Sequence, residues 1–339
     1  MNSTHLDASL RWDGSRLAIV DQTLLPHREQ WLTLDGAADT ADAIRRLAVR
    51  GAPLIGIAAA YGLAMEVTAA PDPEPGMRTL REARPTAVNL AWAVDRVWAA
   101  AQHGGAEAAR AEAERIEAEE ASASAAIAAH GADLLAGARR ILTHCNTGAL
   151  AAPGRGTALA VIAELADRGD LDLVLTCETR PLLQGARLTV YELGRLGIEH
   201  ALVVDGAGAG LIAAGEVDAV IVGCDRVAAN GDVANKVGTY AHALAAAAAG
   251  IPFVVAGPCT TIDPACRTGA EIEVEERDGD EVRAAGLWRG DPLELTVAGT
   301  PCRNPAFDVT PASLVTALVT ERGVATPPTN ESVSGLLGG

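Results

Sequence analysis

Hydrophobic residues follow two different patterns along the chain, and the change between them falls near residue 140. Before that point, apolar residues recur mostly at the spacing of amphipathic helices. The predicted helices cover residues 37–49, 54–67, 91–101 and an Ala/Glu/Arg-rich stretch that follows Gly104-Gly105 and ends near Gly137. One short strand is expected over residues 17–22. The first 125 residues are therefore predicted to form a mainly helical domain (1–125).

After residue 140, short apolar runs alternate with stretches long enough for one helix each. The five runs cover residues 141–145, 171–177, 201–205, 219–223 and 252–256. Strands that alternate with helices are typical of βαβ units and a parallel sheet. We predict an α/β protein, in which a Rossmann-like parallel-sheet domain over residues 126–339 follows the helical domain.

Reactive or polar side chains stand where several of these runs end: Cys145, Glu178, Asp205 and Asp225. Ligands of open α/β sheets bind at the carboxyl ends of the strands, so these residues are expected to line one edge. A helix start after Cys145 could lower its thiol pKa, although spacing alone slightly favours an inert core thiol. His144 and Cys145 should point to opposite faces, which argues against a shared metal site.

The stretch from Asp225 to Lys236 combines an acid with a candidate anion site. Burial would raise the pKa of the Asp225 carboxyl and could keep it protonated as a general acid. Asn235 and Lys236 are predicted to open the next helix, whose N-terminus together with the lysine would hold a phosphate. Alternatively, Asp225 caps a loop and Lys236 is a solvated surface residue, and this stretch alone favours neither interpretation.

A glycine-rich segment after the third run imitates a dinucleotide-binding motif. Gly208, Gly210 and Ala213 fit G-x-G-x-x-A after a strand. However, the helix available before Gly215 is very short, whereas a Rossmann crossover has a full helix. An NAD-linked oxidoreductase is therefore a minority alternative to a tight turn between strand and helix.

Composition narrows the classes of function. The chain has 339 residues, 49% of them hydrophobic, and a formal net charge of −17, so nucleic acid and anionic membranes are not expected partners. Its six cysteines form no CxxC pair, which favours a reducing compartment. The first residues do not resemble a signal peptide, and apolar runs such as 54–60 are too short to span a bilayer. A cytoplasmic protein is expected.

Eight motifs, taken in order, resemble the methylthioribose-1-phosphate isomerases. They cover residues 49–53, 84–89, 143–146, 178–185, 223–226, 229–232, 235–240 and 304–311. The resemblance implies the conversion of 5-methylthioribose 1-phosphate to 5-methylthioribulose 1-phosphate in methionine salvage, without a metal or organic cofactor. The wider superfamily includes regulatory subunits of a translation-initiation exchange factor and ribose-1,5-bisphosphate isomerase.

The resemblance also implies roles for single residues. The family's catalytic cysteine falls on Cys145, as base or transition-state stabiliser, and its proton donor falls on Asp225. Its substrate contacts fall on Arg50, Gly51, Ala52, Arg84, Gln184, Asn235 and Lys236. A homodimer is implied as well. A related substrate, either 5-deoxyribose 1-phosphate or ribose 1,5-bisphosphate, and a non-catalytic regulatory homologue are the alternatives.

Overall fold

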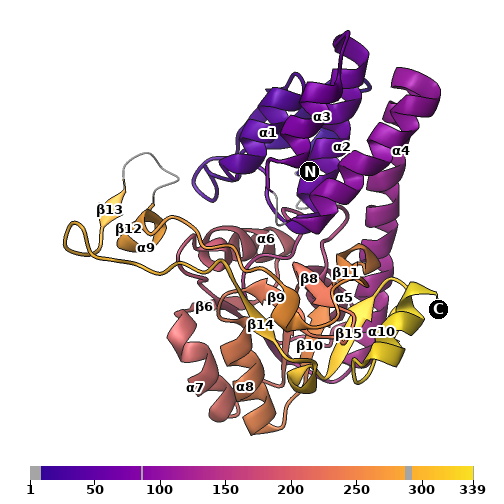
Figure 1. The fold of residues 1–339 in the computed structure, drawn as a ribbon. Helices are drawn as coiled ribbons and strands as arrows, with labels where there is room; N and C mark the ends of the chain where they lie inside the picture. Colours follow the sequence, from indigo (N-terminus) through magenta and orange to yellow (C-terminus); the bar gives the residue numbers. More distant parts are fainter. Residues whose placement is uncertain (1–8, 85–86, 287–291, 339) are drawn as a thin grey trace. The chain divides into compact units, whose positions relative to one another are not determined.

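The computed structural model describes residues 9–84, 87–286 and 292–338 (Figure 1). Within these residues the chain divides into two compact units. The amino-terminal unit comprises residues up to 124 together with 149–156, and the carboxy-terminal unit comprises 125–148 and the chain from 157 onward. The long helix α4 (Val88–Leu134) contributes to both units.

Helices dominate the amino-terminal unit, as the hydrophobic spacing predicts. Besides the first part of α4, the unit contains β1 (Leu10–Trp12), β2 (Leu17–Val20), β3 (Trp31–Leu34), α1 (Ala37–Arg45), α2 (Ala52–Ala69) and α3 (Glu74–Arg81). The strands form one antiparallel sheet in the order β1-β2-β3. The predicted interruption of α4 is confirmed at Gly105, whose φ of 65° and ψ of −153° are not helical.

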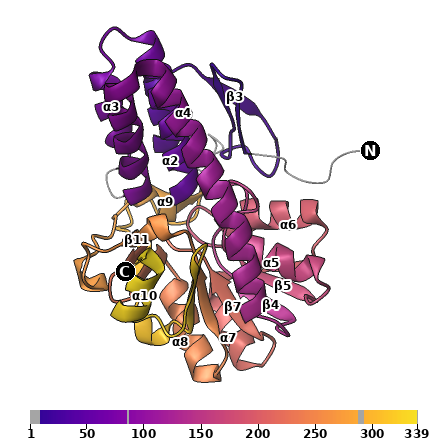
Figure 2. The same ribbon diagram turned by 90° about the vertical axis from the view of Figure 1, so that its right-hand side faces the viewer.

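Helix α2 is the core element of this unit, and Figure 2 shows it beside α3 and α4. All residues from Pro53 to Met65 are buried, so this part of the helix has no polar face. In length and composition α2 could cross a membrane, but 78% of it is buried inside the protein. A helix that is apolar all round is what the centre of a large core requires.

A seven-stranded sheet forms the centre of the carboxy-terminal unit. Its strands are β4 (Arg140–Thr143), β5 (Leu173–Cys177), β6 (His200–Val203), β7 (Ala219–Val222), β10 (Phe253–Ala256), β15 (Ala317–Thr320) and β16 (Gly323–Ala325). They lie in the order β16-β15-β10-β7-β4-β5-β6, and all neighbours are parallel except β15 and β16. The predicted Rossmann-like parallel sheet is confirmed.

Helices cover both faces of this sheet. They are α5 (Ala158–Asp167), α6 (Val190–Leu196), α7 (Gly208–Ala213), α8 (Thr239–Ala249) and α10 (Asn330–Leu337). The sequence of strand β7 is continuously apolar because both of its faces are buried. Val220 and Val222 belong to one hydrophobic core, and Ala219 and Ile221 belong to the other. Strands buried on both faces lack the alternation of a half-exposed sheet.

A smaller sheet follows β7 in the chain. It has the order β11-β8-β9-β14 and consists of β8 (Arg226–Ala228), β9 (Val233–Lys236), β11 (Ile262–Asp263) and β14 (Phe307–Thr310). Helix α9 (Asp280–Arg283) and the hairpin of β12 (Ala284–Ala285) and β13 (Leu293–Glu294) lie between β11 and β14. Residues 229–232, one of the eight motifs, connect β8 to β9, with Gly231 at a φ of 88°.

Candidate active site

The site begins where the strand order of the large sheet reverses. From β4 the chain builds outward to β5 and β6 on one side, and then returns to β7, β10 and β15 on the other. Cys145 follows β4, and Asp225 follows β7. These two strands are parallel neighbours, with Leu142 opposite Val220, so both residues lie at the same edge of the sheet. Ligands of doubly wound folds bind at this switch point.

The turns after β4 and β7 pack directly against each other. A Cβ atom added to Gly223 would lie 2.7 Å from Cγ2 of Thr147, closer than any side chain tolerates. The glycine is therefore required by the approach of the two turns. Cys145 and Asp225 are both half-buried, as residues on the wall of a binding site are.

The backbone of Cys145 has a left-handed conformation with a φ of 66°. Such a conformation is uncommon for residues other than glycine, and it persists only where surrounding contacts hold it. The N–H of Cys145 donates to Oγ1 of Thr179 at 2.8 Å, and Oγ1 of Thr189 donates to the Cys145 carbonyl at 2.6 Å. Both backbone polar groups of the cysteine are thus held by threonines from the chain after β5.

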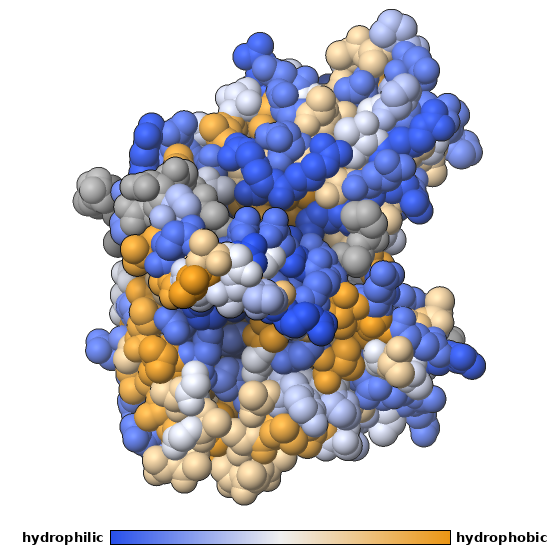
Figure 3. All heavy atoms as spheres, turned by 60° about the vertical axis from the view of Figure 1, so that its left-hand side comes forward, coloured by the Kyte–Doolittle hydropathy of each residue, from blue (hydrophilic) through white to orange (hydrophobic). Residues whose placement is uncertain are grey.

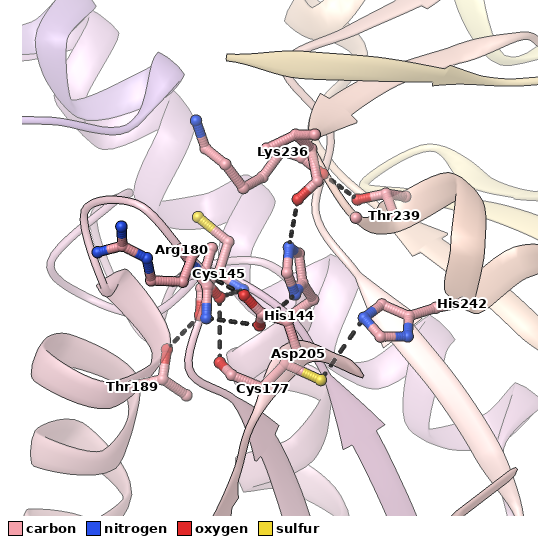
Figure 4. Close-up of polar contacts among 12 residues, drawn as sticks. His144, Cys145, Cys177, Arg180, Thr189, Asp205, Lys236, Thr239 and His242 are labelled. Atoms are coloured by element: carbon pink, nitrogen blue, oxygen red, sulfur yellow. Dashed lines mark hydrogen bonds and ion pairs between the residues drawn. The ribbon is translucent and has the colours of Figure 1, made fainter. Parts of the chain in front are cut away.

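Thr179 is itself held in a left-handed conformation, with a φ of 66°. Its hydroxyl donates to the carbonyl of Cys177 at 3.0 Å. The carboxylate of Asp205, which follows β6, accepts from the N–H groups of Thr179 and Arg180, each at 2.7 Å. Asp205 therefore holds the turn after β5, and that turn holds Cys145 (Figure 4).

Gln184 and the helical turn after it complete this side of the site. Residues Gly185–Thr189 form a π-helical turn, a feature that is frequent at functional sites. A Cβ atom on Gly185 would lie 1.8 Å from the carbonyl oxygen of Cys177, so only glycine fits. Oε1 of Gln184 is buried and has no hydrogen-bond partner among the described residues. A buried acceptor of this kind is suited to a ligand hydroxyl.

Asn235 and Lys236 lie in strand β9, not at the start of a helix as predicted. The prediction was wrong because the chain after Asp232 forms a hairpin with β8 and pairs on its other side with β14. The N–H of Asp225 donates to the carbonyl of Ala234 at 3.0 Å, so Asp225 lies beside this strand. Nζ of Lys236 donates to the Ala306 carbonyl at 2.8 Å.

The next helix N-terminus, predicted as part of a phosphate site, is occupied by a carboxylate. Helix α8 begins at Thr239, and the carboxylate of Asp308 accepts from the N–H of Gly238 at 2.7 Å and of Tyr240 at 3.2 Å. Burial raises the pKa of Asp308, and these N–H donors and Lys236 act in the opposite direction. Asp308 thus takes the position at the positive end of the helix that a phosphate would need.

The predicted residues Arg50, Gly51 and Ala52 lie together in the amino-terminal unit, where α2 begins. Gly51 has a φ of 91°, and a Cβ atom there would lie 2.4 Å from the Ala151 carbonyl oxygen. Arg50 is buried. Arg84 lies after α3 in the same unit and is half-buried. Residues 85–86 of its motif lie outside the described residues.

Comparison with known proteins agrees with this fold. The chain matches the initiation factor 2 subunit family over residues 48–327. It is 52% identical to a methylthioribose-1-phosphate isomerase of Anaeromyxobacter sp. (strain K), over 94% of this chain and 93% of that one. A Synechococcus protein of the same name is 46% identical over 97% of each chain.

Solved structures extend the comparison. The crystal structure of 5-methylthioribose 1-phosphate isomerase from Pyrococcus horikoshii has a TM-score of 0.91 and 35% identity, covering 99% of this chain and 97% of that one. A structure titled translation initiation factor eIF-2B, subunit delta, from A. fulgidus has a TM-score of 0.82 and 37% identity, covering 98% and 99%.

The family match gives the initiation-factor fold, and the named relatives place the chain among the aldose–ketose isomerases of sugar phosphates. The chain belongs to the initiation factor 2 subunit family and, within it, to the methylthioribose-1-phosphate isomerases. The resemblance carried by the eight motifs is therefore confirmed.

The hydrogen bond from the Cys145 N–H to Thr179 can be tested by substitution of the threonine. Thr179→Val keeps the shape of the side chain but removes the acceptor of the Cys145 N–H. We expect kcat for isomerisation to fall roughly tenfold to a hundredfold, because small misplacements of a reacting group are costly. The free energy of unfolding should fall by about 1–3 kcal/mol, because a buried donor loses its partner. Steady-state kinetics and urea unfolding measure both quantities.

Thr320→Val is the matched control. Thr320 is fully buried in the same unit, and its hydroxyl also donates to a carbonyl and accepts a backbone N–H. It should lose stability but keep kcat, and Thr179→Ser should restore most of the lost activity. Equal kcat in Thr179→Val and Thr320→Val would contradict a positioning role for Thr179.

Proposed function

We propose that this protein converts 5-methylthioribose 1-phosphate to 5-methylthioribulose 1-phosphate in methionine salvage, with Cys145 and Asp225 as the catalytic residues. One observation carries the proposal: the thiol and the carboxyl follow neighbouring parallel strands at the switch point of the sheet. Relatives that are 46–52% identical to this chain carry the name of that isomerase. A purely regulatory homologue would have no need to keep this pair.

The chemistry explains why an acid is required. The C1 hydroxyl of the substrate is esterified, so the ring cannot open spontaneously to a free aldehyde. Asp225, protonated, donates a proton to the ring oxygen, as a general acid does. Hydrogen then moves from C2 to C1, with Cys145 acting as the base or as a stabiliser of the transition state.

Several residues of the carboxy-terminal unit support substrate binding. The buried Oε1 of Gln184, which has no hydrogen-bond partner in the described part of the chain, supports a contact with a sugar hydroxyl. Asn235 and Lys236 share a strand with Ala234, whose carbonyl accepts from the N–H of Asp225. From the resemblance, we also include Arg50, Gly51, Ala52 and Arg84 among the substrate contacts. No metal or organic cofactor is part of the proposal.

A regulatory role is the second candidate, because a structure titled as a translation initiation factor subunit is 37% identical to this chain. An assay of the purified protein on 5-methylthioribose 1-phosphate, 5-deoxyribose 1-phosphate and ribose 1,5-bisphosphate separates the possibilities. We expect the largest kcat/KM on 5-methylthioribose 1-phosphate. Turnover of none of the three sugars, with no shift of the melting temperature, would favour the regulatory role.

The catalytic pair leads to a second prediction for this enzyme. Asp225→Asn cannot supply a proton of the same acidity, so turnover should fall by at least ~10²-fold while binding is retained. Cys145→Ser should fold and be nearly inactive. Steady-state kinetics and circular dichroism test both expectations.

Cys302→Ser is the control, since Cys302 is another half-buried free thiol of the same unit. It should keep full activity. Near-normal turnover of Asp225→Asn would remove the acid from the mechanism, and an active Cys145→Ser would return Cys145 to the role of a core thiol.

We propose further that the protein is a homodimer. Strand β6 is an edge of the large sheet, and Leu202 in it and Val204 after it are 50% and 61% exposed. Tyr240 and Leu244 of α8 are exposed as well, and Figure 3 shows apolar residues gathered on this part of the carboxy-terminal unit. Exposed apolar patches mark association surfaces.

Light scattering should give twice the chain mass of 34.7 kDa for the unmodified protein. The double variant Leu202→Lys with Leu244→Lys places charges on the apolar surface and should shift the mass toward one chain. A mass of 34.7 kDa for the unmodified protein would disprove the dimer, and an unchanged dimer in the variant would exclude this surface.

A further inference from the structure

A cluster of nitrogen and sulfur atoms lies in the interior, at the base of the turns that hold Cys145. His144, Cys177 and His242 are 1%, 0% and 2% exposed. One imidazole nitrogen from each histidine and the sulfur of Cys177 lie within 4.8 Å of one another. The residues come from the ends of β4 and β5 and from α8, so three separate elements converge on one point. The proposed isomerisation does not use them.

His144 has the arrangement of a metal-binding histidine. Its Nε2 lies 2.8 Å from the carbonyl oxygen of Val237, which can only accept, so Nε2 carries the proton. Nδ1 then presents its lone pair to the cluster, and it is buried with no hydrogen-bond partner among the described residues. Metal-binding histidines usually donate their other N–H to a carbonyl or carboxylate in this way.

The spacing of the other two residues suits a tetrahedral metal ion. Sγ of Cys177 lies 3.5 Å from Nε2 of His242. Bonds of about 2.3 Å to sulfur and about 2.0 Å to nitrogen place such ligand atoms about 3.5 Å apart around zinc. The rings of His144 and His242 approach edge to face, with centroids 5.1 Å apart.

Charge and protonation are also compatible with a cation. Oδ1 of Asp205 lies 3.9 Å from Nδ1 of His144 and provides a negative charge beside the cluster. Burial lowers the pKa of His242 to about 4 and raises the pKa of Cys177 to about 12, so the histidine is neutral and the thiol is protonated. A metal would displace the thiol proton, as in other thiolate sites. A divalent ion, a thiolate and a carboxylate together carry no net charge.

We propose that His144, Cys177 and His242 form a binding site for a divalent cation of the zinc class, with the Asp205 carboxylate beside it. Imidazole and thiolate ligands select zinc or cobalt over magnesium or calcium, which prefer oxygen. The site is distinct from the catalytic thiol. Figure 4 shows the side chain of Cys145 directed away from His144 and His242, toward the side on which Lys236 lies.

Cobalt(II) is the probe, because its absorption reports ligand type and geometry. The full-length protein should be produced with cobalt in the medium and analysed for metal content and absorption. We expect one ion per chain, intense visible bands of a tetrahedral ion, and a near-ultraviolet thiolate-to-cobalt band. Cys177→Ser should abolish the ultraviolet band, and Cys177→Ser and His242→Gln should each weaken binding more than the ~10²-fold that loss of a supporting contact can cost.

Two other cysteine variants are the controls. Cys259 is buried in the same unit but lies outside the cluster, and Cys145 adjoins His144 in the chain but is not part of the cluster. Cys259→Ser and Cys145→Ser should each keep both bands. Loss of the bands in Cys145→Ser, or their persistence in Cys177→Ser, would overturn the proposal.

A measurement on the unmodified protein covers the case in which Cys177→Ser does not fold. X-ray absorption of the zinc-loaded protein should show one sulfur and at least two nitrogen neighbours. Failure to retain metal after production with zinc, or a shell of nitrogen and oxygen alone, would refute the site.

Discussion

The left-handed backbone at Cys145 is the constraint on which the catalytic edge of the sheet depends. A strand that continued past β4 would alternate its side chains between two buried faces, and the thiol would enter a core. The turn at Cys145 ends the strand geometry, so the side chain of Cys145 does not enter a core. His144 is buried, whereas Cys145 is half-buried. A left-handed L-residue costs ~1–3 kcal/mol, so surrounding contacts must hold it.

The contacts that hold this turn link three parallel strands. Asp205 after β6 binds the turn after β5, and Thr179 in that turn binds Cys145 after β4. Each step uses a backbone N–H donor and a side-chain oxygen acceptor. The position of the thiol therefore depends on the turns after β5 and β6 as well as on its own strand.

A half-buried carboxylate is held by backbone N–H groups at the start of α8 as well. In this chain of net charge −17, the carboxylates of Asp205 and Asp308 each accept hydrogen bonds from two backbone N–H groups. Because Asp308 occupies the N-terminus of α8, the positive end of that helix dipole stabilises its carboxylate.

Sequence patterns predicted most of the fold, and they failed where distant segments decide the local structure. Continuous apolar runs identified five of the strands, and in four of them, β4, β5, β7 and β10, the run reflects burial on both faces of the sheet. Asn235 and Lys236 were assigned to a helix, because nothing local shows that residues 307–310 pair with them. Thr179 and Thr189 were not recognised, because their role depends on meeting Cys145 across gaps of 34 and 44 residues.

The glycine-rich segment after Asp205 shows how packing can imitate a binding motif. Gly208 fits the dinucleotide pattern, but a Cβ atom there would lie 2.7 Å from Cε1 of His242, so glycine is required by the approach of α7 to α8. Helix α7 has six residues, and its segment follows β6 at the sheet edge, away from the switch point beside β4. A dinucleotide would need a full helix at that switch point. The motif therefore reflects helix packing, and the proposed catalytic residues lie instead in the turns after β4 and β7.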